Sequence, residues 1–392
     1  MNDTVRQFRD FFVSLRLTVV LLALSMILVF AATLDQVNLG IWAVQEKYFH
    51  SLFVLWRIPG TAIPLPVFPG GYLIGGFLLV NLVAAHVYRF KLTWRKSGIF
   101  LTHAGLILLL VGELLSGLWQ EEFQLQLREG ETKTYAESYR YNELAIIDTT
   151  DPQFDDVVVI PETLLADSTP IQHPKLPFRV VTKEYYPNAA LRLRAGTGEN
   201  PSLATAGIGP QITATPLPLT YKQDERNWPA AFVELAGPEG SLGIWLVSPQ
   251  LQAPQTFDYG GRTWRIGMRP QRAYKPFSLT LLKTTHDVYL GTDIPKNFAS
   301  RLRLTTPDGR DDREVLIYMN NPLRYAGLTF YQYQMDGEHA MSVLQVVRNP
   351  SWRLPYISCA MITLGLIVQF CIHLSGFIGK RRASAAYPPA RP

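Results

Sequence analysis

Residues 98–119 read GIFLTHAGLILLLVGELLSGLW, and His103 and Glu113 are the only ionisable side chains in this stretch. A bilayer core needs about 20 apolar residues per helix, so the stretch predicts a membrane span. A short basic segment, 89–97, precedes it, and a polar sequence of ordinary soluble composition follows it. The stretch therefore marks a boundary between a membrane part of the chain and a soluble part.

Three more apolar runs have the length of a span, at 15–33, 70–88 and 355–377. Between the runs 98–119 and 355–377, apolar and polar residues alternate in short segments, as in 123–127, 264–268, 277–281 and 302–304. Such alternation predicts half-buried strands separated by turns. We therefore expect a membrane α plus all-β protein. Three transmembrane helices would precede, and one would follow, a large antiparallel β-sandwich or barrel-like domain at 120–354.

The chain is 47% hydrophobic and 18% charged, with a formal net charge of +5. Basic residues cluster in 1–14, in the turn 89–97 and in the tail 378–392, whereas the longer segment 34–69 has few. Because basic loops stay in the cytoplasm, these three segments are predicted to be cytoplasmic. The domain 120–354 would then lie in the periplasm, on the outer side of a bacterial inner membrane. The charge thus indicates orientation in a lipid bilayer and not binding of nucleic acid.

The outer loop 34–69 carries a helical stripe of apolar residues over 41–56. This pattern predicts a short helix that lies at the membrane surface or packs on the outer domain. The two cysteines, Cys359 and Cys371, lie in the last span, and no CxxC motif is present. The chain is therefore no thioredoxin-like disulfide exchanger, and its outer domain has no disulfide framework.

Three of the seven histidines fall inside predicted spans, where coordinating side chains are costly and often functional. His103 lies seven residues after Lys96, or roughly 10 Å deep at 1.5 Å per residue. His373 lies at a matching depth in the last span, and His86 would be shallower. An imidazole pair across a helical bundle can hold haem iron. The alternatives are a packed core histidine at 103 and a side chain that reaches the interface at 86.

His339, in the sequence Asp-Gly-Glu-His, precedes the last span closely enough to meet a haem near the outer surface, or it is a solvated loop residue. No serine-hydrolase elbow, phosphate loop, zinc-protease motif or haem-attaching CxxCH is present. The sequence therefore predicts no enzyme that works alone. The cofactor-binding candidates are His103, His86, His373 and His339, with His103 as the metal ligand of a haem b.

Two segments carry a family resemblance. The first is SGIFLTHAGLILLLVG at 97–112, followed by FQLQLREGE at 123–131; the second is YMNNPLRYAGLTFYQ at 318–332. Both resemble the ResB/CcsB family of cytochrome c biogenesis proteins, and the order of spans and outer domain matches along almost the whole chain. In the second segment Pro322 would fix a turn, Gly327 would permit a tight one, and Phe330 and Tyr331 would lie on opposite faces of a strand.

The resemblance implies a haem-handling subunit that works with a multi-span membrane partner of the ResC/CcsA type. Apocytochrome c and a membrane thioredoxin-like reductant would be further partners, and His103 would be a haem contact shared with the multi-span protein. On this reading the chain is an accessory subunit of a haem-attaching (haem lyase) complex that helps to export haem and present it to apocytochrome c. Two alternatives remain open. One is an in-chain bis-histidine b-type cytochrome for electron transfer, and the other is a non-catalytic, membrane-anchored β binding domain.

Overall fold

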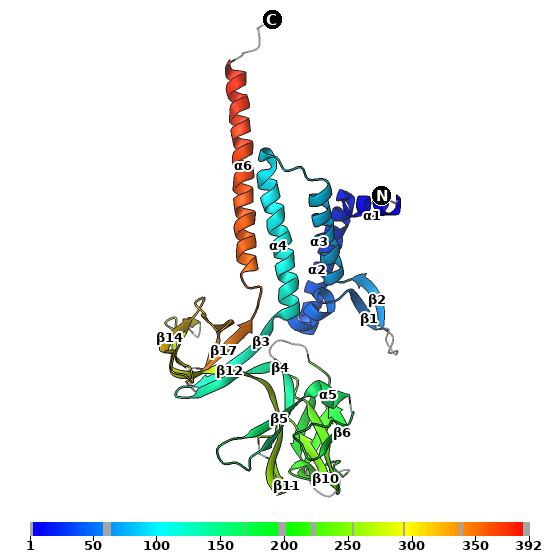
Figure 1. The fold of residues 1–392 in the computed structure, drawn as a ribbon, viewed down its shortest axis with the longest axis vertical. Coiled ribbons are helices and arrows are strands. Elements are labelled where there is room, and N and C mark those ends of the chain that lie inside the picture. Colours follow the sequence, from blue (N-terminus) through cyan, green and yellow to red (C-terminus); the bar gives the residue numbers. More distant parts are fainter. Residues whose placement is uncertain are drawn as a thin grey trace. The chain divides into compact units, whose positions relative to one another are not determined.

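The computed structural model describes residues 3–57, 64–167, 169–194, 201–220, 225–252, 255–292, 295–336 and 340–386 of the chain. It divides into two compact units, which we describe separately (Figure 1). The helical unit comprises residues 1–121 and 349–392, and the β unit comprises residues 122–348.

The helical unit contains every long helix of the described chain. Its elements are α1 (Asp3–Phe12), α2 (Leu15–Val44), the π-helical turn η1 (Gln45–Phe49), β1 (Phe53–Arg57), β2 (Pro64–Pro69), α3 (Gly71–Tyr88), the 3-10 turn η2 (Trp94–Lys96), α4 (Ser97–Trp119) and α6 (Leu354–Ala386). Four stretches are long and apolar enough to cross a membrane: Leu15–Phe49, Gly71–Tyr88, Trp94–Trp119 and Leu354–Arg382. The predicted three N-terminal spans and one C-terminal span are confirmed.

The first span differs in detail from the sequence prediction. Its helix continues past Thr33 to Val44, with a break at Gly40, where φ is 77°. Asp35 explains part of this arrangement, because its carboxylate accepts hydrogen bonds from Lys47 Nζ (2.6 Å) and Tyr48 Oη (2.9 Å) and so fastens η1 back onto α2. The helix expected over 41–56 ends at Phe49, and the antiparallel β1–β2 hairpin follows.

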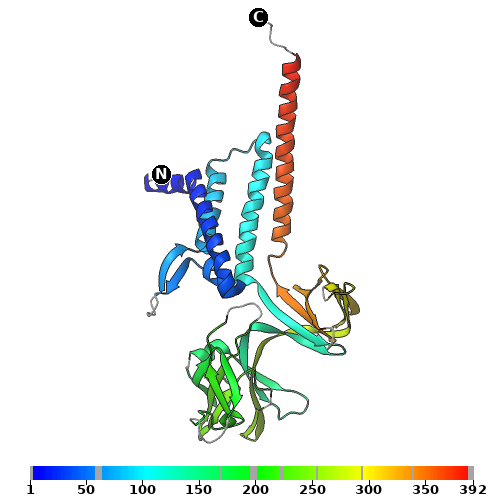
Figure 2. The same ribbon diagram turned by 180° about the vertical axis from the view of Figure 1, so that it is seen from behind.

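Glycine allows α4 and α6 to pack side by side, as both ribbon views show (Figure 2). Gly98, Gly105 and Gly112 are buried and recur every seven residues, so they share one face of α4. A Cβ added at Gly98 would lie 2.5 Å from the carbonyl oxygen of Gly365 on α6. One added at Gly105 would lie 2.7 Å from Ile362 Cγ1. Small residues of this kind let membrane helices approach closely.

The β unit is built almost entirely from antiparallel strands. They are β3 (Glu121–Arg128), β4 (Thr132–Asp148), β5 (Asp156–Pro161), β6 (Arg179–Tyr186), β7 (Ala189–Leu193), β8 (Ile212–Pro216), β9 (Ala230–Gly237), β10 (Gly240–Val247), β11 (Gln255–Tyr259), β12 (Arg262–Val288), β13 (Pro295–Thr305), β14 (Asp312–Tyr318), β15 (Leu323–Tyr325), β16 (Leu328–Asp336) and β17 (Met341–Arg348). The short helix α5 (Glu162–Ala166) and the 3-10 turn η3 (Gly209–Gln211) complete the described elements.

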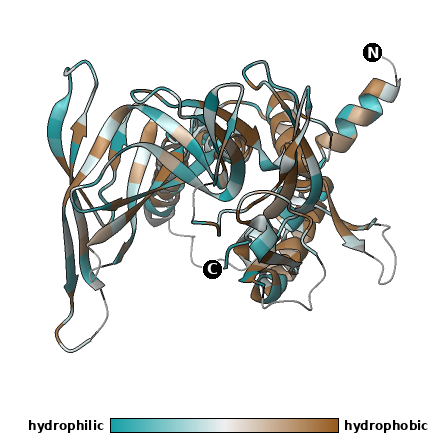
Figure 3. Cartoon of the chain, turned by 90° about the horizontal axis from the view of Figure 1, so that it is seen from below, coloured by the Kyte–Doolittle hydropathy of each residue, from teal (hydrophilic) through white to brown (hydrophobic). Residues whose placement is uncertain are grey.

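One ten-stranded sheet organises the β unit, with the order β14-β13-β12-β4-β3-β17-β16-β15 and with β5 and β11 attached at the side. The two longest strands, β4 and β12, pair along their length with register shifts near Pro270 and after Tyr274. Each strand thereby contributes to two hydrophobic cores, one around Leu281 and Phe330 and the other around Ile146 and Trp264. Buried and more exposed residues alternate along much of β12, as the sequence predicted, and apolar and polar bands follow one another along the strands of the β unit (Figure 3).

The first core fills a nearly closed barrel. β14 and β15 are the two edge strands of this part of the sheet. An antiparallel bridge between Tyr318, at the end of β14, and Asn321, just before β15, brings the two edges together. Inside the barrel, Ser300 Oγ donates to Gln332 Oε1 (2.6 Å) and lies 2.7 Å from Ser342 Oγ. These polar groups satisfy one another where water is excluded. The second core fills a sandwich. In it, the sheet β10-β9-β6 packs on the C-terminal half of β4 and the N-terminal half of β12.

Both motifs that carry the family resemblance shape the barrel. In the turn at 129–131, Gly130 has a φ of +83° and donates its N–H to Leu281 O, while the Glu129 carboxylate accepts two bonds from Thr284. In the second motif the β15–β16 turn needs positive φ at Gly327 (77°). Phe330 is buried in the barrel core, and Tyr331 on the opposite face of β16 is exposed, as predicted.

Candidate functional site

The strongest candidate site lies where α3 and α4 meet near the basic turn 89–97. His86, in the last turn of α3, packs against His103 of α4 with ring centroids 4.9 Å apart and ring planes at 85°. Phe90 stacks on the His86 ring at 5.2 Å, and Phe100 lies 6.1 Å from His86. Two imidazoles from apolar helices are thus in direct contact, flanked by aromatic rings.

The hydrogen bonding of the pair leaves ring nitrogens available. His86 Nδ1 lies 3.0 Å from the carbonyl oxygen of Leu82, so in the neutral ring this nitrogen carries the proton and donates it. His86 Nε2 and His103 Nδ1 are buried and have no hydrogen-bond partner among the described residues. A buried polar atom without a partner costs free energy and suggests an unfilled role. A histidine that donates from one nitrogen while the other is free is also how metal-binding imidazoles are oriented.

The separation of the rings limits how the pair could hold iron. With iron–nitrogen bonds of about 2 Å, two imidazoles on opposite sides of one haem have centroids roughly 6 Å apart. The observed 4.9 Å is shorter, and the rings touch edge to face. In this arrangement the two rings are too close together to ligate one iron from opposite sides.

The other predicted site residues do not join this pair. His373 is exposed on α6. The glycine face of α4 packs on α6, whereas His103 contacts α3, so the depth match between His103 and His373 does not bring them together. His339 lies outside the described residues. Within the described ranges, no cluster of three or more His, Cys, Asp or Glu side chains could hold a metal ion.

From the sequence, His103 and His373 are predicted at matching depth in the membrane, and His86 is predicted closer to the membrane surface. The signal that would have favoured His86 is the connection itself. Spans that are joined by the tight turn 89–97 must run antiparallel as neighbours, so side chains within about two turns of it can meet. Span four, by contrast, is separated from span three by more than 200 residues, and its neighbours cannot be inferred from the connection.

A second histidine contact lies at the opposite end of α3. His50 stacks on Tyr72 at 5.5 Å, and its Nδ1 is 3.2 Å from the Glu46 carboxylate. A Cβ added at Gly117 of α4 would lie 3.0 Å from Tyr72 Oη. The sequence predicted no role for His50. Its contacts with Glu46 and Tyr72 are consistent with a structural role for this side chain.

Glu162 and Arg226 belong to a half-buried polar cluster of the β unit. Asn142 donates to the Glu162 carboxylate (2.9 Å) and accepts from Arg226 (3.3 Å), whose guanidinium lies 4.9 Å from the Trp228 ring. Burial raises the pKa of Glu162 and lowers that of Arg226. Burial also raises the pKa of Tyr185 to about 12. The cluster members contact one another, which fits a structural role at the edge of the sandwich.

Two comparisons with known proteins bear on this architecture. Residues 246–342, from the end of β10 to the start of β17, match the ResB-like family. Protein NrfI of Wolinella succinogenes is 25% identical to this chain over 297 residues, which cover 74% of this chain and 29% of NrfI. The chain therefore spans less than a third of the length of that relative.

The fold defines a membrane protein with four candidate spans and one large antiparallel β domain. The matched region contains the second of the two motifs that suggested the family. Residues 246–342 are ResB-like and the chain is distantly homologous to NrfI, so the family resemblance read from the sequence is confirmed.

Proposed function

We propose that the chain is a haem-handling membrane subunit of a cytochrome c assembly complex. It helps to export haem and to present it to apocytochrome c, together with a multi-span partner of the ResC/CcsA type and with a membrane thioredoxin-like reductant. It is an accessory subunit of the haem-attaching complex and not an enzyme on its own. The observation that carries the proposal is the contact of His86 with His103 inside two apolar helices, each with a buried ring nitrogen that has no partner in the described chain.

The distribution of charge supports the placement of the β unit outside a bacterial inner membrane. Basic residues concentrate beside α1, in the turn between α3 and α4, and at the end of α6. These three segments belong to the same end of the helical unit (Figure 1). By the positive-inside rule this end is cytoplasmic, and the β unit then faces the periplasm, where apocytochrome c is found.

The chain's own residues would bind and orient haem b. The bond from His86 Nδ1 to Leu82 fixes the orientation of that ring and leaves Nε2 as a lone-pair donor. Phe90 and Phe100 supply apolar surface of the kind that a macrocycle packs against. Haem b, when bound, would supply an iron centre that accepts an imidazole ligand. His103 would be the first-choice ligand, with His86 as its neighbour, and the contact with the haem would be shared with the partner subunit.

Site-directed variants of the complex test this proposal. His103→Ala and His86→Ala, each co-expressed with the partner, should lower the haem that copurifies with the complex, measured by absorbance of the pyridine derivative. His286→Ala is the matched control, because His286 belongs to β12 of the β unit and not to a candidate span. Unchanged haem content in both membrane variants, with the partner still bound, would reject the site. His373→Ala tests whether the exposed imidazole of α6 contributes, and His339→Ala does so for the outer surface.

The direct contact between two imidazoles keeps one alternative open, an in-chain b-type cytochrome for electron transfer. The lone chain, purified without any partner, distinguishes the two functions. A stoichiometric low-spin haem spectrum from the lone chain would favour the cytochrome, and it would require the rings to move apart by about 1 Å or more. The third alternative, a membrane-anchored β binding domain without haem, predicts a colourless complex in every preparation.

A further inference from the structure

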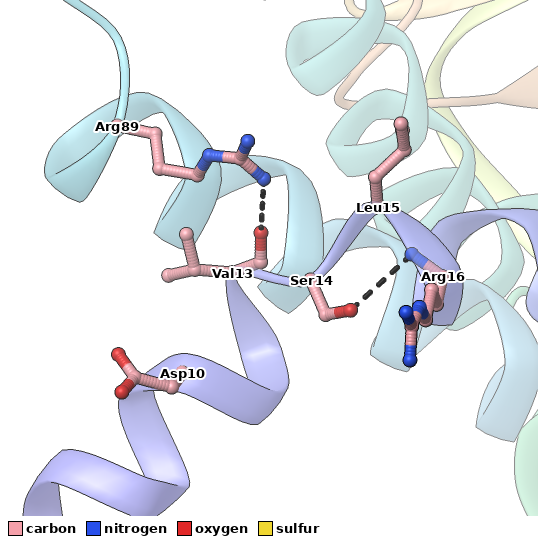
Figure 4. A pocket seen from close by; sticks show the side chains of 6 residues that line it. All are labelled: Asp10, Val13, Ser14, Leu15, Arg16 and Arg89. Carbon is pink, nitrogen blue, oxygen red and sulfur yellow. Dashed lines mark hydrogen bonds between the residues drawn. The ribbon is translucent and has the colours of Figure 1, made fainter.

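The junction between α1 and α2 forms a polar cavity at the same end of the helical unit. The cavity has a volume of about 440 Å³ and is lined by Asp10, Val13, Ser14, Leu15, Arg16 and Arg89 (Figure 4). These residues come from the end of α1, the two-residue link to α2, the first turn of α2 and the residue after α3. Because α2 and α3 are candidate spans that begin or end here, the cavity lies at the depth of lipid headgroups.

The cavity carries an excess of positive charge. The Asp10 carboxylate is paired with Arg9, whose Nη2 and Nε lie 2.6 and 2.8 Å from Oδ1. The Arg89 guanidinium donates one hydrogen bond to Val13 O at 3.2 Å, which leaves its other N–H groups available. The Arg16 guanidinium has no ion-pair partner in the described part of the chain. The exposed residues Arg16 and Arg89 both line the cavity, and the carboxylate that lines it, Asp10, is ion-paired with Arg9.

Ser14 adds a hydroxyl donor to this charge. Its Oγ accepts a hydrogen bond from the backbone N–H of Arg16 at 3.2 Å, so its own O–H is free to donate (Figure 4). Two arginines and a hydroxyl are the donor set that phosphate groups prefer, because guanidinium matches the geometry of phosphate oxygens.

An apolar cavity lies beside the same junction. It has a volume of about 250 Å³, and its lining residues on α1, α2 and α3 are all apolar, among them Phe11, Leu17, Leu21 and Phe77. Neighbouring residues divide between the two cavities, since Asp10 and Arg16 line the polar one while Phe11 and Leu17 line the apolar one. A polar space next to an apolar one fits a molecule that has a charged head and a hydrocarbon chain.

The helix α1 has the character of a helix that lies in the membrane surface. Val5, Phe8 and Phe11 are exposed on it, while Arg6 and Asp10 lie on its other face. Amphipathic helices of this kind rest at the boundary of headgroups and acyl chains. The helix is held there by Asn81 of α3, whose side-chain amide donates to Phe12 O at 2.7 Å.

We infer that this junction is a binding site for an anionic phospholipid. Its phosphate lies between Arg16 and Arg89 with the Ser14 hydroxyl, and an acyl chain lies in the apolar cavity between α1, α2 and α3. Bound in this way, the lipid links α1 to α3 in the leaflet that the basic turn 89–97 faces. The inference does not depend on haem binding.

Native mass spectrometry of the full chain in mild detergent tests the site. Phosphatidylglycerol, an anionic lipid, should remain bound as one tightly held molecule per chain, and zwitterionic phosphatidylcholine should not. The double variant Arg16→Gln/Arg89→Gln should bind phosphatidylglycerol roughly tenfold more weakly, the order that charge-assisted hydrogen bonds contribute. Arg6→Gln is the matched control for the single variant Arg16→Gln, because it also removes one positive charge but lies on α1 outside the cavity lining.

Several outcomes would overturn the inference. They are equal retention of the two lipids, an equal loss in Arg6→Gln, or inorganic phosphate that binds in lipid-free detergent with the same dependence on Arg16. The last result would indicate a site for free phosphate. If the double variant does not fold, Arg16→Gln alone decides the matter, since that guanidinium bonds to no described residue. Size-exclusion profiles of each variant report folding independently of lipid.

Discussion

The packing of α4 on α6 makes a quantitative prediction about glycine. In Gly365→Ala the new Cβ would lie 2.5 Å from Thr102 Oγ1, 2.7 Å from Thr102 N and 2.8 Å from Gly98 O. The Thr102 hydroxyl can rotate away, but the backbone nitrogen and oxygen belong to α4 and cannot. The substitution should therefore push the two helices apart, while the conformation of each helix by itself tolerates alanine.

The magnitude follows from the geometry. A comfortable contact is about 3.5 Å, so the helices must separate by roughly 0.7–0.8 Å at this point. A gap of this size forfeits a quarter to a half of the dispersion energy of the contacts around it. Overpacking of a tight interface typically costs about 1–3 kcal/mol, and we expect Gly365→Ala to lower the stability of the helical unit by that amount. Gly98→Ala should cost the same, because its Cβ would lie 2.6 Å from Gln369 N.

The assay is thermal unfolding of the detergent-solubilised chain, followed by tryptophan fluorescence. Gly376→Ala on the same helix is the control, since nothing lies within 4 Å of its added Cβ. It should be neutral or stabilising, because alanine favours helix over glycine by up to about 1 kcal/mol. The double variant Gly98→Ala/Gly365→Ala should cost less than the sum of its parts, because a single separation relieves both clashes. If Gly365→Ala and Gly376→Ala unfold at the same temperature, the clash between the added Cβ at residue 365 and α4 does not lower the stability of the helical unit.

Two further predictions concern polar contacts. Hydrogen bonds from Thr284 lower the pKa of Glu129, so the ionised carboxylate stabilises the β unit above its ordinary pKa, and this stabilisation is lost as pH falls through the lowered value. At pH 7 Glu129→Gln should therefore be less stable than the wild type by under about 1 kcal/mol in this exposed site, measured by thermal unfolding. The difference should vanish in acid, and a difference that persists at low pH would contradict this origin. In the helical unit, Asn81→Ala removes the acceptor of the Thr18 hydroxyl (2.6 Å) together with the bond to α1, and it should cost about 1 kcal/mol in thermal unfolding, whereas the exposed Asn38→Ala should cost nothing measurable.

Much of the candidate site followed from one-dimensional features of the chain. The length of each apolar run predicted four spans, because a helix must cross a bilayer of fixed thickness with its backbone satisfied internally. The alternation of residues in segments such as 277–281 predicted strands, since side chains of a strand point to opposite faces. The positions of His86 and His103 inside apolar runs marked them as candidates before any contact was known.

Contacts between distant segments required the tertiary structure. The pairing of His103 with His86, the bond network around Ser300 and the cavity between Arg16 and Arg89 all depend on which faces of the elements meet.

The sequence by itself determined the number of spans, the strand-rich character of the middle region and the family, because hydrophobic length, residue period and motif are properties of contiguous residues. Only the tertiary structure decided which imidazoles touch and how α4 and α6 approach. The choice among neighbouring helices rests on side-chain volume at contacts such as Gly98 with Gly365, which lie far apart in the sequence. That complementarity exists only when both helices are in place.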